Sequence, residues 1–201
     1  MKLKELTTIR TGLVLSRKKA SLHNNFKKNY KQITLKSFSN TTTLLPQYFD
    51  SFISSEEIKD EYISRVGDIV VRLREPNIAV YIDEESAGMI IPSLMAIVRV
   101  NNEKIDKEYL ANYLNSTNVK RALQMQIKGT TIAMIKTKDL EDIEVVIPTM
   151  TEQKSLVKLL KSSQEELQLL NQLQEQKEKF ALSVLDTVIN KTKEDNTNAK
   201  N

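Results

Sequence analysis

The chain has 201 residues, a hydrophobic fraction of 40% and a formal net charge of +4 at pH 7, and its mean hydropathy is −0.38. This length suits one domain of ordinary size plus an extended element, and no apolar run approaches the ~20 residues that span a bilayer. The sequence has no cysteine, which excludes disulfides, thiolate metal sites and cysteine nucleophiles. Because the opening MKLKELTTIRTG also lacks the apolar stretch of a signal peptide, we expect a cytoplasmic protein.

The first third of the chain is basic. Residues 1–12 predict a short strand or helical turn that closes at Gly12. From Arg10 to Lys36 there are eight Lys and Arg residues and no acidic residue. An unbroken positive field of this kind suits contact with a phosphate backbone, and the alternative is a solvated loop without a partner. Residues 17–30 read as a loop, whereas Lys31–Ser37 predicts a half-buried strand because apolar and polar residues alternate there.

The middle of the chain predicts strands and helices in mixed order. Tyr48, Phe49 and Phe52 are expected to seal a core edge, with base stacking as the alternative. Strands are predicted over Ile69–Leu73, Ile78–Ile82 and Met89–Val100, the third with a bulge or edge at Pro92. Helices are predicted over Ile105–Leu114 and Val119–Gln126, and a last strand is predicted from Leu140 and Ile143–Ile147. Because the βαβ spacing is irregular, we predict a mixed α+β domain.

A long helix is predicted after Pro148. Thr149 and Glu152 have the spacing of a capping box, and the helical pattern runs to about Ile189, a rod of roughly 60 Å. Seven apolar residues follow a four-three repeat, as in a coiled-coil seam: Leu156, Leu160, Leu167, Leu170, Ala181, Val184 and Val188. The repeat is interrupted at Ser163, Gln174 and Lys177. The chain offers no second long helix, so we predict pairing between chains, with folding back onto its own domain as the alternative.

These patterns divide the chain into three parts. Residues 1–148 are expected to form a recognition domain, residues 149–190 a helix for dimerisation and spacing, and residues 191–201 a polar, disordered tail.

The sequence carries no recognisable catalytic constellation. The single histidine, His23, lies in the basic loop, and the four glycines are too far apart for a phosphate-cradling loop. The triplets Glu57-Ile58-Lys59 and Glu175-Gln176-Lys177 match only the end of a nuclease motif. A chain so rich in charge holds such triplets by chance. We therefore predict a binding module that is not an enzyme and holds no metal or cofactor.

Several segments, in this order, resemble the specificity subunit of type I restriction-modification systems. They are Lys2–Leu6 with Ile9 and Gly12, Gly67–Val71, Ile91–Ile97, the YLANYLNS run Tyr109–Ser116, Lys128–Thr131 and the P-x-x-E-Q segment Ile147–Gln153. Family members usually carry two target-recognition domains and two long helices, in roughly twice this length. This chain has one of each, lacks the tryptophan often found near the start, and has Thr149 where a second proline is common. It therefore looks like a half-length subunit.

The resemblance implies a DNA-binding, non-catalytic subunit. Two copies paired through antiparallel helices would read a palindrome interrupted by a gap, in double-stranded DNA. The implied partners are methyltransferase subunits that bind S-adenosylmethionine and, where the complex also cleaves, a restriction subunit. Two other hypotheses stay open: a coiled-coil adaptor whose head binds protein, and a decoy half-subunit that modulates a host complex.

Candidate DNA contacts follow from residue chemistry. The expected phosphate contacts are Arg17, Lys18, Lys19, Lys27, Lys28, Lys128 and Lys136, with Thr130 and Thr131 offering hydroxyl and backbone N–H groups. Arg72 and Arg74 share a face by strand alternation and are candidates for reading guanine. The alternative is that these arginines form an ion pair with Glu75, Glu84 or Glu85. Asn24 and Asn25 are candidates for reading adenine, and the alternative is that these two residues form a turn.

Overall fold

The structure is a computed structural model that describes residues 1–20, 28–39, 42–74, 77–127 and 134–198, with side chains described as far as residue 189. It contains two compact units, Met1–Val157 and Lys158–Asn201. The first unit holds all the strands of the described residues and the shorter helices. The second consists of the rest of the long C-terminal helix.

A four-stranded antiparallel sheet forms the centre of the first unit. Its order is β1 (Thr7–Thr11), β6 (Met95–Val100), β4 (Ile69–Arg72) and β5 (Ala79–Tyr81). Residues of β4 alternate between two hydrophobic clusters: Ile69 and Val71 belong to one, and Val70 belongs to the other. The sheet is therefore covered on both faces, which explains why its central strands are nearly continuous apolar runs.

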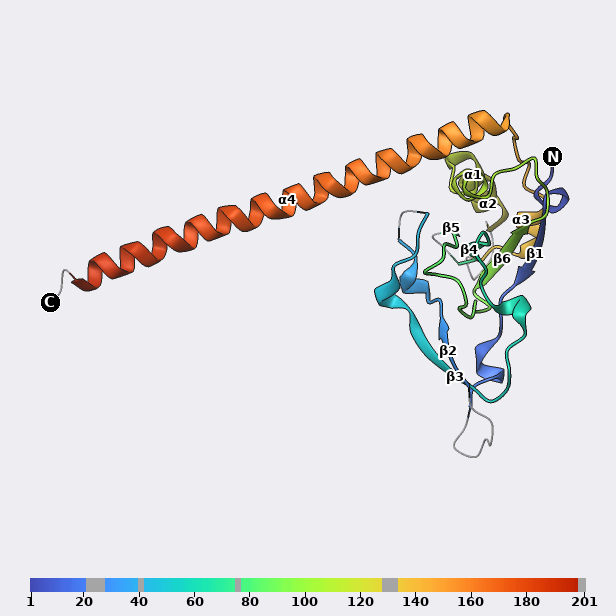
Figure 1. Ribbon diagram of the computed structural model, residues 1–201, viewed down its shortest axis with the longest axis horizontal. Coiled ribbons are helices and arrows are strands. Elements are labelled where there is room, and N and C mark those ends of the chain that lie inside the picture. Colours follow the sequence, from blue (N-terminus) through green and yellow to red (C-terminus); the bar gives the residue numbers. More distant parts are fainter. Residues whose placement is uncertain (21–27, 40–41, 75–76, 128–133, 199–201) are drawn as a thin grey trace. The chain divides into compact units, whose positions relative to one another are not determined.

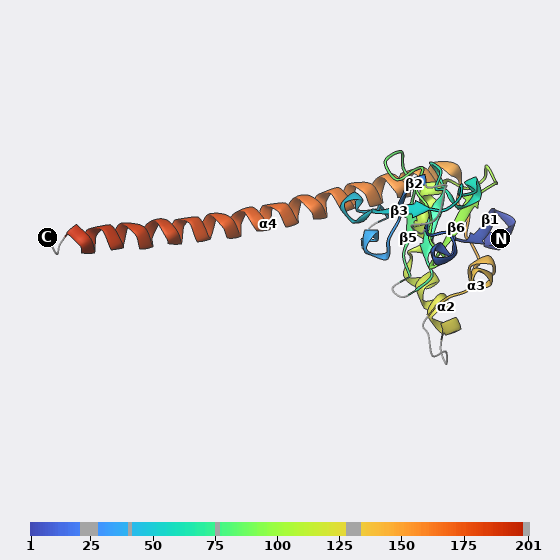
Figure 2. The same cartoon turned by 90° about the horizontal axis from the view of Figure 1, so that it is seen from below.

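Three helices cover one face of this sheet (Figure 1). They are α1 (Lys107–Leu114), α2 (Thr117–Ile127) and α3 (Thr137–Glu141). Leu110, Leu123 and Leu140 join the cluster of Ile69 and Val71. In both views α2 and α3 lie on the same side of the sheet (Figures 1 and 2).

The opposite face carries a second, two-stranded sheet. Strands β2 (Lys28–Gln32) and β3 (Asp50–Ser54) pair antiparallel, and we call them the ribbon. Short 3-10 helices lie around it and at the N-terminus: η1 (Leu3–Glu5), η2 (Leu15–Arg17), η3 (Leu35–Ser37), η4 (Pro46–Tyr48) and η5 (Asp60–Tyr62). Figure 1 shows the four-stranded sheet between the three helices and this ribbon. The ribbon is thus separated from α1–α3 by the thickness of the sheet.

The long helix α4 (Met150–Asn198) begins with the predicted capping box. The Thr149 backbone N–H donates to the Glu152 carboxylate at 2.8 Å, and the Glu152 N–H donates to the Thr149 hydroxyl at 3.3 Å. Hydrogen bonds from Thr149 to this carboxylate lower the pKa of Glu152. Both figures draw α4 as one continuous helix. Within the described residues, no helix combines the length and apolar character needed to cross a bilayer.

The α+β prediction is confirmed, as are the strands over residues 69–73 and 78–82 and the two helices after residue 105, to within a few residues at their ends. Other element predictions are wrong. The strand predicted over Lys31–Ser37 lies earlier, starting at Lys28 inside the predicted loop, and Leu35–Ser37 is a 3-10 helix. The chain turns away from β3 there because the Ile33 N–H donates to the Ile90 carbonyl. Pro92 precedes β6 and does not interrupt it.

The predicted last strand is also absent from the described residues. Leu140 lies in α3, and the extended segment after it forms one isolated bridge, between Glu144 and Lys2. Pairing stops there because the chain next to Lys2 turns into η1. At the other end of α4, the helix continues to Asn198, so the tail predicted to be disordered from residue 191 is helical as far as that residue.

Candidate nucleic-acid interface

The ribbon has one buried and one exposed face. Tyr30 packs against the small cluster that contains Phe52, with Leu13 and Ile90 in the same cluster. The alternate positions, Asn29, Lys31, Ser51 and Ile53, are exposed. In the register of the pair, Asn29 lies opposite Ile53 and Lys31 lies opposite Ser51. These four side chains therefore form a continuous outward face, as strand alternation requires.

Several predicted phosphate contacts gather at one end of the ribbon. Ser54 pairs with Lys28 in the ribbon and with Lys19 in an isolated bridge. The Ser55 N–H donates to the Lys18 carbonyl at 2.8 Å. Arg17 ends η2 directly before these lysines and is exposed. The structure thus brings Arg17, Lys18, Lys19 and Lys28 together, which we call the ribbon-end group.

The positive field predicted to be unbroken between Arg10 and Lys36 is interleaved with carboxylates in space. Lys18 pairs with Glu56, Lys28 pairs with Glu57 at 2.7 Å, and Arg10 pairs with Glu61 at 2.5 Å. The hydrogen bond to Glu57 raises the pKa of Lys28 and lowers that of Glu57, and the hydrogen bond from Arg10 lowers the pKa of Glu61. The Lys28 ammonium also lies 5.3 Å from the centre of the Tyr30 ring. This end of the ribbon is therefore less positive than the sequence alone indicates.

A second group of candidates lies where β4 ends. Leu73 is buried between half-buried Arg72 and exposed Arg74, so the two arginines share a face as predicted. Arg74 bridges to Met134, and the Ile135 N–H donates to the Leu73 carbonyl at 2.9 Å. Lys136 follows at the N-cap of α3, where its backbone N–H donates to the Asp139 carboxylate at 2.7 Å. Arg72, Arg74 and Lys136 therefore form a group separate from the ribbon-end group.

The remaining candidates lie outside the described residues. They are Asn24, Asn25, Lys27, Lys128, Thr130 and Thr131. Glu75, one of the acidic residues considered as a partner of the arginines, also lies outside them.

Sequence reasoning missed the outward face of the ribbon. Only Asn-Tyr-Lys-Gln marks β2 after Lys28, and this run contains one aromatic residue among polar ones. The signal that could have revealed the ribbon lies in the strand paired with β2, Asp50–Ser54, where Phe52 and Ile53 interrupt a polar run. The position of Phe52 as a core residue was predicted, and it is 7% exposed. Phe49 packs against the core partly buried, whereas Tyr48 is exposed.

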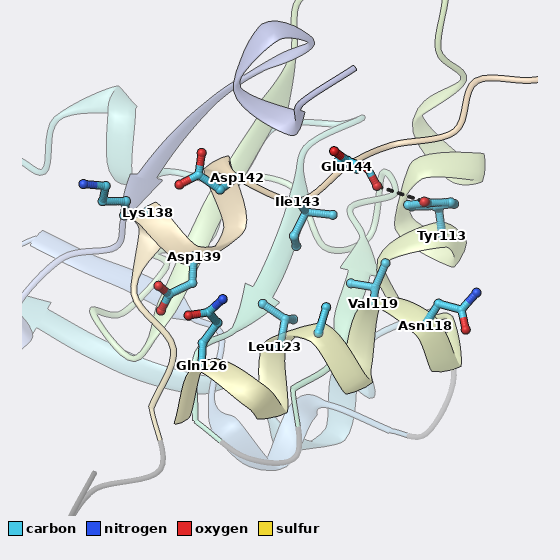
Figure 3. A pocket seen from close by; sticks show the side chains of 11 residues that line it. Tyr113, Asn118, Val119, Leu123, Gln126, Lys138, Asp139, Asp142, Ile143 and Glu144 are labelled. Atoms are coloured by element: carbon cyan, nitrogen blue, oxygen red, sulfur yellow. Dashed lines mark hydrogen bonds between the residues drawn. The ribbon is translucent and has the colours of Figure 1, made fainter. Parts of the chain in front are cut away.

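A hollow of about 510 Å³ lies beside α2 and α3, on the other side of the sheet. Val119 and Leu123 of α2 form its apolar wall, and Asp139, Asp142 and Glu144 contribute carboxylates (Figure 3). Lys2 pairs with Asp142 at 2.9 Å and lowers the pKa of that carboxyl group. Because carboxylates repel phosphates, this hollow does not suit a nucleic-acid backbone.

Comparison with known proteins places this arrangement in context. Residues 1–179 match the family model described as the type I restriction modification DNA specificity domain. The type I restriction enzyme MjaVIII specificity subunit of Methanocaldococcus jannaschii is 26% identical over 161 residues, which cover 77% of this chain and 36% of that protein. The putative MjaX specificity subunit of the same organism is 27% identical over 126 residues, covering 61% of this chain and 28% of that protein. The chain thus spans about a third of these relatives.

Two solved structures share the fold at 20% identity. The HsdS subunit from Thermoanaerobacter tengcongensis superposes with a TM-score of 0.56, covering 87% of this chain and 39% of that chain. A chain from a structure described as the basis of complex assembly and conformational transition of the type I R-M system superposes with a TM-score of 0.59. This match covers 88% of this chain and 40% of that chain.

Proposed function

Because the chain belongs to the family of type I restriction modification DNA specificity domains, we propose that it acts as a specificity subunit of a type I restriction-modification complex. The first compact unit, Met1–Val157, which we call the head, binds double-stranded DNA and selects the sequence. Its partners are methyltransferase subunits, with a restriction subunit where the complex also cleaves. The observation that carries this proposal is the family match over residues 1–179, which includes both the head and most of α4.

The distribution of basic residues supports DNA binding by the head. In the ribbon-end group and in the group of Arg72, Arg74 and Lys136, every cationic residue is exposed or half-buried. Lysine and arginine at such positions fix a protein on the phosphate backbone, whereas sequence is read by contacts to base edges. Within this proposal the chain selects the DNA site, and the methyltransferase subunits bind S-adenosylmethionine and methylate the DNA.

The apolar face of α4 supports homodimerisation. Six of the seven predicted seam residues are large and apolar, and they are between 41% and 58% exposed: Leu156, Leu160, Leu167, Leu170, Val184 and Val188. Beside them, Leu159, Leu173 and Phe180 are 66%, 51% and 69% exposed. A row of exposed apolar side chains of this length is the usual mark of a protein–protein contact. A second copy of the same helix offers a face of matching period.

An antiparallel pair centred on Gln172 fits the seam. In this register Leu160 lies opposite Val184 of the partner copy, and Ser163 lies opposite Ala181 of the partner copy. Large residues thus meet large ones, and small residues meet small ones, at these two levels of the seam. One two-fold axis relates the two copies, and both contribute the same surface to the interface. The assembly therefore stops at a dimer.

The polar interruptions are also accommodated in this register. Gln174 lies opposite Leu170 and Lys177 lies opposite Leu167, where a long side chain can bury its stem and keep its polar head in water. Asn171 and Leu173 each lie one residue from the two-fold axis, so each comes close to its own counterpart in the partner copy. The dimer would present two identical heads in opposite orientation, which corresponds to a palindromic site interrupted by a gap.

Adenine methylation across the genome tests this function. We expect a split, symmetric motif to be methylated in cells that carry the gene with its methyltransferase subunit, and to lose methylation when the gene is deleted. Restoring the gene on a plasmid should restore the same motif. An unchanged methylation pattern, together with salt-insensitive or absent DNA binding by the purified complex, would contradict the proposal.

A further inference from the structure

We propose that the outward face of the ribbon, formed by Asn29, Lys31, Ser51 and Ile53, reads base edges in the major groove of DNA. The inference rests on the proposed function, since it assigns the reading surface of a DNA specificity domain. It differs from the two arginine and lysine groups described above, because three of its four residues carry no charge. It also concerns a strand pair that the sequence alone did not reveal.

The shape of the ribbon fits the proposed ligand. The major groove of B-DNA is about 12 Å wide and admits a two-stranded β-ribbon. On the outward face, Asn29 faces Ile53 and Lys31 faces Ser51 in adjacent cross-strand pairs. Side chains in such pairs lie about 5 Å apart, so the face spans more than one base-pair step of about 3.4 Å. All four side chains are exposed, and Ile53 is 52% exposed.

The chemistry of the four side chains covers distinct base edges. An asparagine amide pairs with N6 and N7 of adenine, a lysine ammonium donates to O6 and N7 of guanine, and a serine hydroxyl donates or accepts. An exposed apolar side chain such as Ile53 can contact the thymine methyl group. A face that served only as a solvated surface would not require this combination of an amide, a hydroxyl, a cation and an alkyl group in two adjacent pairs.

The side chains are held before any ligand binds. The Ser51 hydroxyl donates to the Asn29 amide oxygen at 2.7 Å, diagonally across the two strands. This bond orients the amide and leaves its NH₂ group directed to other acceptors, while the oxygen retains a second lone pair. Orientation in the free protein lowers the entropy lost on binding.

The ribbon is also supported from behind. Its inward residues Tyr30 and Phe52 pack in the cluster that contains Ile58 and Ile90. The Ile58 backbone N–H donates to the Tyr30 hydroxyl at 3.0 Å, which ties the ribbon to the chain that follows it. A rigid element presents reading groups more accurately than a loop does.

Charge around the ribbon is mixed: Lys18 and Lys28 are paired with Glu56 and Glu57, and Glu85 lines a hollow together with the outward face, whereas Arg17 and Lys19 are exposed cations. The ribbon-end group lies at the Lys28–Ser54 end, where phosphates flanking the groove would lie. At the other end, Asp50 accepts a hydrogen bond from the Ser51 backbone N–H at 2.9 Å, which satisfies part of this carboxylate locally. Asp50 is exposed and can accept from N4 of cytosine.

The test compares methylated motifs in cells that carry the wild-type gene or a variant, together with the partner methyltransferase subunit. The variants are Asn29→Ala, Lys31→Ala, Ser51→Ala and Ile53→Ala. Matched controls are Asn101→Ala and Lys104→Ala, which remove an exposed amide and an exposed ammonium from the segment between β6 and α1. Thermal unfolding of each purified chain establishes that the variants fold, as expected for exposed positions.

We expect each ribbon variant to relax the preference at one position of each half-site, by roughly tenfold to hundredfold for Asn29 and Lys31. The controls should keep the wild-type motif. If all four variants keep the wild-type motif and methylation level, the ribbon does not read bases, although the proposed function stands. Uniform loss of methylation with an unchanged motif would also overturn base reading, because it indicates a backbone or protein contact. If the wild-type gene yields no motif at all, the proposed function itself fails.

Discussion

At the level of single residues, buried polar side chains account for parts of the family-like motifs. Gly67 has a φ of 88°, which a glycine adopts without strain. Asp68, which follows it, is 4% exposed and accepts hydrogen bonds from Nε and Nη2 of Arg99 at 3.0 and 3.1 Å. The Arg65 N–H also donates to this carboxylate at 2.9 Å. The Gly-Asp pair thus fixes the turn into β4 and links it to β6.

Asp68→Ala should lower the free energy of unfolding by about 3–5 kcal/mol, because it leaves the half-buried Arg99 guanidinium without its carboxylate. Asp68→Asn keeps the shape and the acceptor oxygen and should cost less. Urea denaturation of the purified chains measures both effects. Asp60→Ala, at an exposed position, is the control. Equal stability of Asp68→Ala and the control would show that the Asp68–Arg99 pair does not support the fold.

Gln153 explains the last residue of the P-x-x-E-Q segment. Its side chain is fully buried, at 0% exposure. The amide oxygen accepts from the Asp106 N–H at 2.7 Å, and the amide nitrogen donates to the carbonyls of Lys104 and Pro148 at 2.9 Å each. Asp106 is the N-cap of α1. One side chain therefore ties the first turn of α4 to the start of α1 within the head.

Gln153→Leu should destabilise the head by about 2–4 kcal/mol. Leucine occupies a similar volume but leaves one N–H and two carbonyl groups without this partner, and each unsatisfied buried group costs about 1–3 kcal/mol, partly relieved by water. The loss is measured as a lower midpoint in urea denaturation. Gln168→Leu changes the same residue type at an exposed position of the same helix and should have little effect. A stable Gln153→Leu variant would contradict this role.

At the level of elements, the sequence predicted those that carry strong apolar patterns. The strands β4 and β5 and the helix α1 were found because their apolar residues are dense and regularly spaced. The ribbon was missed because it is half exposed and its inward positions in β2 are Tyr30 and Gln32. The helix α3 has five residues, too few to show a helical period.

The electrostatics of the candidate site depended on contacts that no local pattern contains. Residues 10–36 hold no acid, yet Glu61 reaches Arg10 from 51 residues away and Glu57 reaches Lys28 from 29 residues away. The position of Lys19 and Lys28 on either side of Ser54 likewise follows from their shared pairing with that residue. Residue types were therefore predictable, whereas their neighbours in space were not.

The seam of α4 can be tested with charges. Leu167→Asp combined with Leu170→Asp should convert a dimer into a monomer, because each copy loses two large apolar side chains from the seam and gains two carboxylates whose desolvation costs free energy. Light scattering after size-exclusion chromatography gives the mass. Gln168→Asp combined with Gln172→Asp adds the same charge to the other side of the helix and should leave the dimer intact. A dimeric mass for the leucine variant would remove the seam hypothesis.

The antiparallel register has its own test, because the chain lacks cysteine. A thiol introduced by Leu173→Cys lies beside the two-fold axis and should cross-link two copies through a short bis-maleimide. A thiol from Glu175→Cys points to the outer face and should cross-link poorly. Efficient cross-linking at residue 175, with none at residue 173, in a chain that remains dimeric would show a different register.

For the whole molecule, the proposed division of labour is between a reading head and a helix that sets distance. In the proposed homodimer each copy contributes one head, so the two heads together recognise two half-sites. Identical heads read identical half-sites, which makes the target symmetric. The separation of the half-sites then depends on how many helical residues lie between the two heads, and this number can be changed without altering either head.

An insertion of seven residues in α4 after Gln172 tests this relation. Seven residues keep the heptad phase of the seam and lengthen a helix by about 10 Å at ~1.5 Å per residue. The two heads of an antiparallel dimer would move apart by that length, which corresponds to about three base pairs at ~3.4 Å each. We therefore expect the methylated motif to keep both half-sites and to gain about three base pairs in its gap. The same seven residues inserted after Ile189, beyond the seam, should leave the gap unchanged. A gap that stays constant when the seam is lengthened would show that α4 does not set the spacing.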